Sequence, residues 1–370
     1  MIVIIDSLAF GGEAVGRADG LVLFVAGGVP GDELEVRVVE RKPRFARAEI
    51  VRVVRPSPDR IEPPCPIAHE CGGCPWQMVA VSAQLREKET IVRRALGRVS
   101  DKIDPILEAP ASLGYRTRVK MTKREGVLGF QARKSHRLVA IDHCVALDPR
   151  LDAALNQSRA KILAKLAEGD SVSAVISPKG EVGLSTDGEQ LIDVGEERSH
   201  VTSPSGFQQA SEVQNRVLRA LVRDALDVGG YDLLELYAGD GNFTRDLTDA
   251  RKIVAVESDR AAAARLSKNV SSARVLALPS EIALAQLSAD KFDRVLLDPP
   301  RAGAKEAIAG IARLEPERIV YVSCDPMTLA RDLADFKSRG YEIARVQPID
   351  MMPHTSHVET VVTLVRAARA

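Results

Sequence analysis

The sequence predicts a multidomain α/β protein with an N-terminal OB-like β-barrel, a central α+β domain and a C-terminal doubly wound domain of Rossmann-like form. Three observations support this fold class. The chain has 370 residues, which is too long for one ordinary hydrophobic core. Its first part shows short strands split by glycine turns, and its last part alternates apolar strands with helical stretches. We expect the domains to span residues 1–56, 57–205 and 206–370.

The first 56 residues contain short apolar stretches broken by turns. Gly11-Gly12, Gly27-Gly28 and Pro30-Gly31-Asp32 supply the breaks. Several short strands in so small a unit favour a barrel of OB type. The expected strands are Met1–Ile5, Leu21–Val25, Glu33–Glu40 and Ala46–Val54.

The remaining chain changes from a mixed pattern to a regular alternation. After a proline-rich linker, helices are expected at Ala83–Leu96 and Leu151–Ala167, the second among strands. From about Gln209, short apolar runs alternate with helical stretches, which predicts a parallel sheet with helices on both faces. The apolar runs are Leu233–Leu236, Lys252–Val256, Arg294–Leu297 and Arg318–Val322.

The composition limits the class of protein. Lysine plus arginine equals aspartate plus glutamate, at 51 each, so net charge gives no indication of a nucleic-acid partner. No apolar run reaches about 18 residues, so we expect no membrane span, and the start of the chain lacks the charged beginning of a secretory signal. An odd number of cysteines, five, argues against a pure disulfide framework. We therefore expect a soluble, cytoplasmic protein in a reducing compartment.

Two segments are nevertheless locally basic. Residues 37–60 carry eight basic side chains against three acidic ones, and residues 115–137 carry eight against one, with Tyr115 and Phe130 among them. A basic stretch with an aromatic side chain can bind the phosphates and bases of RNA. The alternative interpretation is a solvated strand face, because such charge runs are common.

Three cysteines lie close together, with a C-x5-C-x2-C spacing and two glycines between the last two. Cys65, Cys71 and Cys74 form this group, and Cys144 is a fourth candidate from a later strand. Converging thiolates suit either an iron–sulfur cluster or structural zinc, and His69 could serve a zinc site. The spacing therefore predicts a metal centre and leaves both metals open, with unrelated buried cysteines as the alternative.

A strand that runs into a glycine turn predicts a nucleoside site. Residues 233–243 read L-L-E-L-Y-A-G-D-G-N-F, and Gly239 and Gly241 let the backbone approach a ligand. The next strand ends in Glu257, which can accept hydrogen bonds from both ribose hydroxyls. Thr244 stands where a dinucleotide fingerprint has glycine, so a nucleoside without a pyrophosphate fits better, and we expect S-adenosylmethionine. A structural strand–helix turn is the alternative.

Polar residues at the ends of later strands predict the chemistry. Asp298 opens a D-P-P-R segment, and Cys324 follows the next strand; ligands bind at the carboxyl ends of parallel strands. Arg301, in place of an aromatic residue, argues against methylation of amino groups. Cys324 also precedes an expected helix, where the pKa of a thiol can be lowered, so we expect a nucleophile rather than an inert buried cysteine. Glu359, at the start of the last apolar strand, is either a general base or a salt-bridged strand end.

Together these residues resemble the RNA 5-methyluridine methyltransferase family over essentially the whole chain. Residues 1–56 look like its TRAM domain, an OB-like RNA-binding barrel. The cysteine spacing is similar to its [4Fe–4S] motif, which implies that Cys65, Cys71, Cys74 and Cys144 hold a cluster. Matches to its cofactor motifs, including the F-x-Q segment at 207–209, imply contacts with S-adenosylmethionine from Gln209, Tyr237, Gly239, Gly241, Asn242, Glu257 and Asp298.

The resemblance also implies the reaction. S-C-D-P around Cys324 resembles the nucleophile motif, H-V-E-T around Glu359 the base motif, and D-P-P-R the motif of a catalytic Asp298. The implied activity is methylation of carbon 5 of a uridine, through a bond between the cysteine sulfur and carbon 6. The combination of TRAM domain and cluster favours 23S ribosomal RNA over transfer RNA. An RNA-binding protein with an inactive methyltransferase domain is a further alternative, and we expect a monomer.

Two positions depart from the family pattern. Asp325 stands where the nucleophile motif usually has asparagine, and Ser211 stands where asparagine usually follows the F-x-Q segment. Residues 278–280, after the third strand, offer no obvious contact for the adenine. None of these positions is the proposed nucleophile or base, so we expect effects on affinity and substrate rather than on reaction type.

Overall fold

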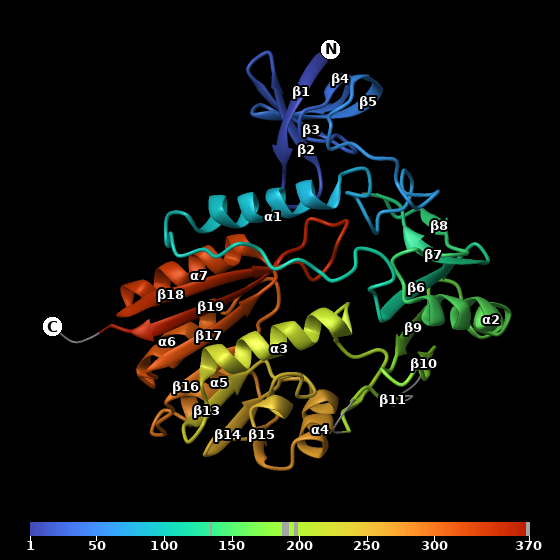
Figure 1. The fold of residues 1–370 in the computed structure, drawn as a ribbon. Coiled ribbons are helices and arrows are strands. Elements are labelled where there is room, and N and C mark those ends of the chain that lie inside the picture. The colour runs from blue at the N-terminus through green and yellow to red at the C-terminus, as the bar shows by residue number, and fades with distance from the viewer. Residues whose placement is uncertain (134, 187–191, 196–198, 368–370) are drawn as a thin grey trace.

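The computed structural model describes residues 1–367 apart from residue 134, residues 187–191 and residues 196–198. A small barrel, a mixed domain and a larger sheet flanked by helices follow one another along the chain (Figure 1). Helix α1 (Val81–Leu96) lies between the barrel and the large sheet. Within the described residues, no helix combines the length and the apolar character needed to cross a bilayer.

The predicted N-terminal barrel is confirmed, with five strands in the closed order β1-β2-β3-β5-β4. Alternate side chains such as Val3 and Ile5 fill its core, as expected for strands with one buried face. One strand was not predicted, because its sequence A-V-G-R-A has a weak pattern; a Cβ at Gly16 would lie 2.5 Å from Ile4 O, so glycine permits the close pairing with β1. The strands are β1 (Ile2–Leu8), β2 (Ala14–Ala18), β3 (Leu21–Val25), β4 (Glu33–Arg41) and β5 (Phe45–Arg55).

The central part of the chain contains an antiparallel sheet covered by helix α2 (Pro149–Lys165). Asp148 caps this helix by accepting from Arg150 N, and proline at the first position suits a helix start. The sheet has the order β10-β9-β6-β7-β8. Its strands are β6 (Arg118–Arg124), β7 (Val127–Gln131), β8 (Leu138–Ala140), β9 (Ser171–Ile176) and β10 (Val182–Ser185). A short hairpin of β11 (Ile192–Asp193) and β12 (Val201–Thr202) follows.

The predicted doubly wound domain is a seven-stranded sheet in the order β15-β14-β13-β16-β17-β19-β18. The first five strands of this order are parallel, whereas β19 pairs antiparallel with both β17 and β18. The strands are β13 (Asp232–Leu236), β14 (Lys252–Val256), β15 (Ala273–Leu276), β16 (Arg294–Leu297), β17 (Arg318–Ser323), β18 (Tyr341–Ile349) and β19 (Glu359–Arg366).

Helices cover both faces of this sheet, and neighbouring strand residues enter different cores. Leu233 packs in the same core as α3, whereas Leu234 packs in the core that includes α6 and α7. This alternation explains why the buried strands read as continuous apolar runs. The helices are α3 (Glu212–Leu226), α4 (Arg260–Asn269), α5 (Ser280–Gln286), α6 (Lys305–Arg313) and α7 (Pro326–Ser338), with a 3-10 turn at Thr244–Asp246.

Helix α1 and the chain after it belong physically to the large sheet, although they fall within the range 57–205. Val92 and Leu96 of α1 lie in the same core as α7. The following segment runs beside β18, with bridges from Ile103 to Val346 and from Leu107 to Ile349. α1 therefore joins the barrel and the cysteine segment to the domain that carries the predicted catalytic residues.

Candidate active site

The strand order reverses between β13 and β16, and the predicted cofactor and catalytic residues surround this point. β14 and β15 lie to one side of β13, while β16 and β17 lie to the other. In open parallel sheets, ligands bind in the crevice at the carboxyl ends of the strands where such a reversal occurs. The loop after β13 and Asp298 after β16 flank that crevice, and Glu257 directly follows β14 next to it.

The loop after β13 has the conformation that a tight ligand cradle requires. Tyr237, Gly239 and Gly241 all have positive φ, at 61°, 58° and 97°. A residue other than glycine, such as Tyr237, adopts a positive φ only when its surroundings hold it there, and such residues are common at functional sites. At Gly241 a Cβ would also lie 2.7 Å from Leu266 Cδ1, so a side chain there would meet both strain and a clash.

Glu257 is fixed beside this loop by backbone donors. Its Oε2 accepts from Gly239 N at 2.9 Å, and its Oε1 accepts from Asp259 N at 2.7 Å. The carboxylate thus faces the glycine turn from the neighbouring strand. A carboxylate at this place can accept hydrogen bonds from ribose hydroxyls, as the sequence predicts.

Most of the predicted cofactor residues line one hollow at the loop. Gln209, Tyr237, Gly239, Asn242 and Asp298 all border it, and a second hollow, which Gly239 also borders, reaches Glu257. The side chain of Asn242 is already engaged in paired amide hydrogen bonds of 2.9 and 3.0 Å with Asn215 on α3. The F-x-Q segment is held by β6, since Arg118 Nη1 donates to Gln208 O at 3.0 Å.

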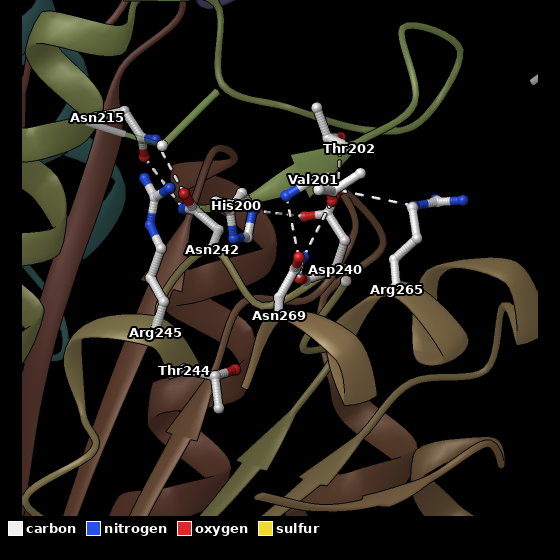
Figure 2. A network of polar contacts seen from close by, with 12 residues as sticks. His200, Val201, Thr202, Asn215, Asp240, Asn242, Thr244, Arg245, Arg265 and Asn269 are labelled. Carbon is white, nitrogen blue, oxygen red and sulfur yellow. Dashed lines mark hydrogen bonds and ion pairs between the residues drawn. The ribbon is translucent and has the colours of Figure 1, made fainter. Parts of the chain in front are cut away.

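Sequence reasoning missed a polar network that ties the hairpin β11–β12 to the cofactor loop (Figure 2). Asp240 is 6% exposed and accepts from Thr202 Oγ1 at 2.5 Å, while His200 Nε2 lies 3.3 Å from its other oxygen. Asn269 Nδ2 donates to Asp240 O at 2.8 Å. The pKa of Asp240 is lowered in spite of burial, mainly by His200. An aspartate between two loop glycines was the signal that could have indicated this anchor.

The sheet register brings Cys324 and Glu359 together. Ser323 at the end of β17 is opposite Thr360 on β19 in the antiparallel pairing. Cys324 and Glu359 each adjoin this last pair, and the charge of Glu359 acts on the Cys324 thiol, so the two side chains lie near one another. Glu359 is 3% exposed, and its Oε1 has no hydrogen-bond partner in the described part of the chain. A salt-bridged strand end does not fit such a buried, unpartnered oxygen.

The lowered thiol pKa that we expected at Cys324 is wrong for this structure. Burial raises the pKa of the Cys324 thiol to about 11, and the carboxyl groups of Glu359 and Asp298 raise it further than Arg301 lowers it. Any lowering of the thiol pKa by the N-terminus of helix α7 is smaller than these effects. The resting enzyme therefore holds a thiol, and a nucleophilic role requires a proton acceptor nearby.

Carboxyl groups that resist ionisation surround this thiol. Burial raises the pKa of Asp298 to about 7 and raises that of Glu359 well above its ordinary value, with the charge of Asp298 as the second cause. Glu235 lies behind them on β13 with a pKa raised to about 8, mainly by burial; it accepts from Thr244 Oγ1 at 2.7 Å. Sequence reasoning missed Glu235, although a lone acid in the apolar strand was a usable signal. The cluster can hold and pass protons near neutral pH.

The two departures from the family pattern both act as helix caps. Asp325 Oδ1 accepts from Met327 N at 2.9 Å and from Thr328 N at 3.1 Å at the start of α7. Ser211 Oγ accepts from Gln214 N at 3.3 Å at the start of α3. Aspartate, asparagine and serine are comparable caps, so these substitutions preserve the local fold.

The four cysteines outside this site border a single cavity of about 230 Å³. Cys65, Cys71, Cys74 and Cys144 line it, while the side chain of His69 is 73% exposed and does not. In the described residues, no group of three or more histidine, cysteine, aspartate or glutamate side chains is placed to hold a single metal ion. Binding of a metal by these cysteines therefore stays a prediction.

The basic segment at 37–60 carries less free charge than its sequence suggests. Six of its eight basic side chains form ion pairs with acids of the barrel or its linker. Arg41 and Arg44, near the turn between β4 and β5, are the two without such an ion pair among the described residues. A solvated strand face accounts for most of this segment, and any phosphate contact would concentrate at the turn.

Comparisons with known proteins agree with this geometry. A family described as tRNA (Uracil-5-)-methyltransferase matches residues 188–367, and the TRAM domain matches residues 1–51. An uncharacterized RNA methyltransferase of Bdellovibrio bacteriovorus is 34% identical over 97% of this chain and 93% of its own. The 23S rRNA uracil-C5-methyltransferase RlmD of Pectobacterium atrosepticum is 31% identical over 97% of this chain and 92% of its own.

A solved structure extends the match to the whole fold. The tRNA (uracil-54, C5)-methyltransferase of Pyrococcus abyssi, in complex with S-adenosyl-L-homocysteine, has a TM-score of 0.79 and 25% identity, and covers 99% of this chain and 100% of its own. The full-length relatives, the matched domains and the arrangement of the site agree. The chain therefore belongs to the RNA uracil-C5-methyltransferase family, whose members use S-adenosylmethionine.

Proposed function

We propose that this enzyme methylates carbon 5 of a uridine in 23S ribosomal RNA, with Cys324 as nucleophile and Glu359 as base. The observation that carries the assignment is that β17 and β19 pair up to Ser323 and Thr360, so the adjoining Cys324 lies near Glu359, whose charge acts on the thiol and whose Oε1 is buried without a hydrogen-bond partner in the described part of the chain. Both lie at the same sheet edge as the hollow that Asp298 shares with the cofactor loop.

The protons can be followed through the cluster of carboxyl groups. Asp298, with its pKa near neutrality, accepts the proton of the Cys324 thiol, and the thiolate adds to carbon 6 of the uracil. The protonated Asp298 can then donate a hydrogen bond to the enolate oxygen. S-adenosylmethionine supplies the electrophilic methyl group for carbon 5. Glu359, in its ionised form, removes the proton from carbon 5, and elimination releases the thiolate. Asp298 then returns its proton to the sulfur, and Glu359 loses the proton from carbon 5 to solvent, which restores both carboxyl groups.

The cofactor contacts follow from the hollows at the loop. We assign Glu257 to the ribose hydroxyls, because it faces the loop through Gly239 N. A Cβ at Gly239 would meet no atom within 4 Å, which supports a nucleoside against this backbone, whereas Gly241 allows the loop to pack against Leu266. Gln209, Tyr237, Asn242 and Asp298 border the adjoining hollow and are assigned to the amino-acid end of the cofactor and to the reacting methyl. Both polar atoms of the Asn242 side chain are hydrogen-bonded to Asn215 on α3. We therefore assign its cofactor contact to the backbone.

The RNA substrate is inferred from relatives and from one exposed ring. Curated relatives named as 23S rRNA methyltransferases match over nearly the full chain. Phe207 is 79% exposed beside the cofactor hollow, where it can stack on a uridine that has left its helix. The Pyrococcus relative acts on tRNA, so tRNA is the second candidate. Mass mapping of both RNA classes from a deletion strain should show one uridine in 23S rRNA without its methyl group.

We also propose that the cysteine cavity holds a [4Fe–4S] cluster. Its four thiols surround one space but are not gathered around a point, which suits a multi-iron group better than a single zinc ion. Burial raises the pKa of Cys71, and Arg133 and Arg116 act against this rise. Each of these arginines has a buried Nε without a hydrogen-bond partner among the described residues. These cations would balance the negative charge of bound thiolates.

Trapping the covalent intermediate tests the assignment. With Glu359→Gln, the thiolate can add and the methyl group can transfer, but the proton at carbon 5 stays, so a methylated RNA should remain bonded to the protein. A denaturing gel with labelled RNA should show a slow band for Glu359→Gln and no such band for Glu359→Gln with Cys324→Ala. Wild-type turnover by Glu359→Gln would exclude it as the base, and a band without Cys324 would exclude that thiol as the nucleophile.

A further inference from the structure

The loop between β18 and β19, residues 350–358, leads directly into the proposed base, and distant parts of the chain dock on it. From the barrel, Gly11 N donates to Ser356 Oγ at 3.1 Å. From the central domain, the hydroxyl of Tyr115 donates to Pro353 O at 3.2 Å. We call residues 350–358 the catalytic loop. Its position thus depends on contacts from outside the domain that contains it.

Lys88 of α1 makes the most deeply buried of these contacts. Its Nζ lies 2.6 Å from Asp350 Oδ1, with exposures of 0% and 1% for the two side chains. The same Nζ donates to Met352 O at 2.9 Å. Two charges removed from water persist only when each satisfies the other, so this pair strongly restrains the start of the catalytic loop relative to α1.

Gln84, one helical turn before Lys88, holds the middle of the loop. Its Oε1 accepts from His354 N at 2.7 Å, and its Nε2 lies 3.0 Å from His354 Nδ1. His354 has a φ of 61°, which a residue with a side chain adopts when its surroundings hold it there. Trp76, two residues after Cys74, donates from its backbone N to His354 O at 3.0 Å. Residues four apart share a helix face, so one face of α1 presents two buried polar groups to this loop.

We propose that Lys88 and Gln84 are positioning residues for the methylation reaction. Through Asp350 and His354 they fix the catalytic loop and thereby set Glu359 opposite Cys324. The inference rests on the proposed role of Glu359 as base. In this account, cofactor binding and proton removal lie at different places on the sheet. The cofactor loop follows β13, Glu359 begins β19, and β16 and β17 lie between these two strands. Loss of the α1 contacts should therefore slow the step that needs the base without weakening the binding of S-adenosylmethionine.

The test combines Lys88→Met with Asp350→Asn in the full-length enzyme, so that neither partner is left as a buried, unpaired charge. We expect kcat for methylation to fall about a hundredfold, as for other small misplacements of a reacting group. The Kd for S-adenosylmethionine should be unchanged, and covalent RNA–protein adduct should accumulate during turnover. The matched control is Arg94→Met, because Arg94 also lies on α1 but donates to Ser7 in the barrel; it should retain wild-type kcat.

The possible outcomes distinguish this inference from the proposed function. If Glu359→Gln traps adduct but the folded double variant keeps wild-type kcat, the positioning role is overturned. A parallel loss of kcat and cofactor affinity without adduct would also overturn it, since that pattern means general loss of structure. If thermal melting shows that the double variant is unfolded, Gln84→Met decides by the same readouts. Normal turnover by Glu359→Gln would instead reject the base itself.

Discussion

Two sites of this protein hold half-buried thiols with similar pKa values, and their neighbours give them different chemistry. Burial is the largest cause that raises the pKa of Cys74 and of Cys324, in each case to about 11. The next influences differ: for Cys74 they are a hydrogen bond with Gln77, which lowers the pKa, and then other thiols and Arg116, whereas for Cys324 they are the carboxyl groups of Glu359 and Asp298. A high thiol pKa therefore does not reveal a function. Cations suit thiols that a bound metal deprotonates outright, and carboxyl groups suit a thiol that must pass its proton to a neighbour.

The largest contrast should come from removing one thiol at each site. Cys324→Ala should reduce methylation to background, because no bond to carbon 6 can form, while S-adenosylmethionine binding and iron content stay normal. Isothermal titration with the cofactor and an iron assay on anaerobic protein provide the comparison. A variant that still methylates RNA would disprove the nucleophile.

The reciprocal substitution is Cys71→Ser in the cysteine cavity. Anaerobically purified wild-type protein should be brown and contain iron, and this variant should lose the colour and become more sensitive to proteolysis in residues 57–205, since ligation energy contributes to folding. Absorbance, iron analysis and limited proteolysis measure these changes. Zinc in place of iron in the anaerobic wild-type protein would reject the cluster.

A smaller effect should separate the electrostatics of the two sites. Ionised Asp298 raises the pKa of the Cys324 thiol, so Asp298→Asn should lower that pKa. Alkylation of Cys324 by iodoacetamide, followed by peptide mass spectrometry, should rise with pH toward a midpoint near 11 in the wild type and near a lower pH in the variant. In anaerobic samples Cys74 should stay unalkylated in both proteins, because the proposed cluster would bind its sulfur. An identical midpoint for Cys324 in both proteins would contradict the coupling.

The smallest effect concerns the barrel. Arg41→Gln with Arg44→Gln should weaken RNA binding and reduce the slope of log K against log salt by about one to two, because fewer phosphates are neutralised. The control is Arg52→Gln with Arg55→Gln, whose charges are already paired with Glu35 and Glu33. Equal losses for both pairs would mean that the turn between β4 and β5 has no special role.

Periodicity and strand-end motifs predicted the barrel, the doubly wound sheet and the residues that meet at its crevice. These features are local: a glycine turn after an apolar strand constrains its own backbone, and the carboxyl end of each parallel strand points to the same edge. The confirmed barrel nevertheless has one strand, β2, that Gly16 concealed. β18 was likewise not predicted, since a bulge between Ile343 and Arg345 interrupts its alternation.

The supports of the site could not be predicted, because they depend on contacts between distant segments. Lys88 and Asp350 are 262 positions apart, and each looks like an ordinary surface charge in its own segment. The raised pKa of Cys324 also follows from burial and from carboxyl groups on other strands, which local sequence does not reveal. Sequence reasoning found the groups that we propose to react, but not the groups that hold them or set their protonation.

The central claim is that Cys324 and Glu359 act on one covalent intermediate. The most direct measurement is mass spectrometry of the RNA–protein complex formed by Glu359→Gln with S-adenosylmethionine, after digestion by protease and nuclease. We predict a single modified peptide in which Cys324 carries a uridine with one added methyl group. An unmodified Cys324, a nucleotide on another residue, or a uridine without the methyl group would contradict this account.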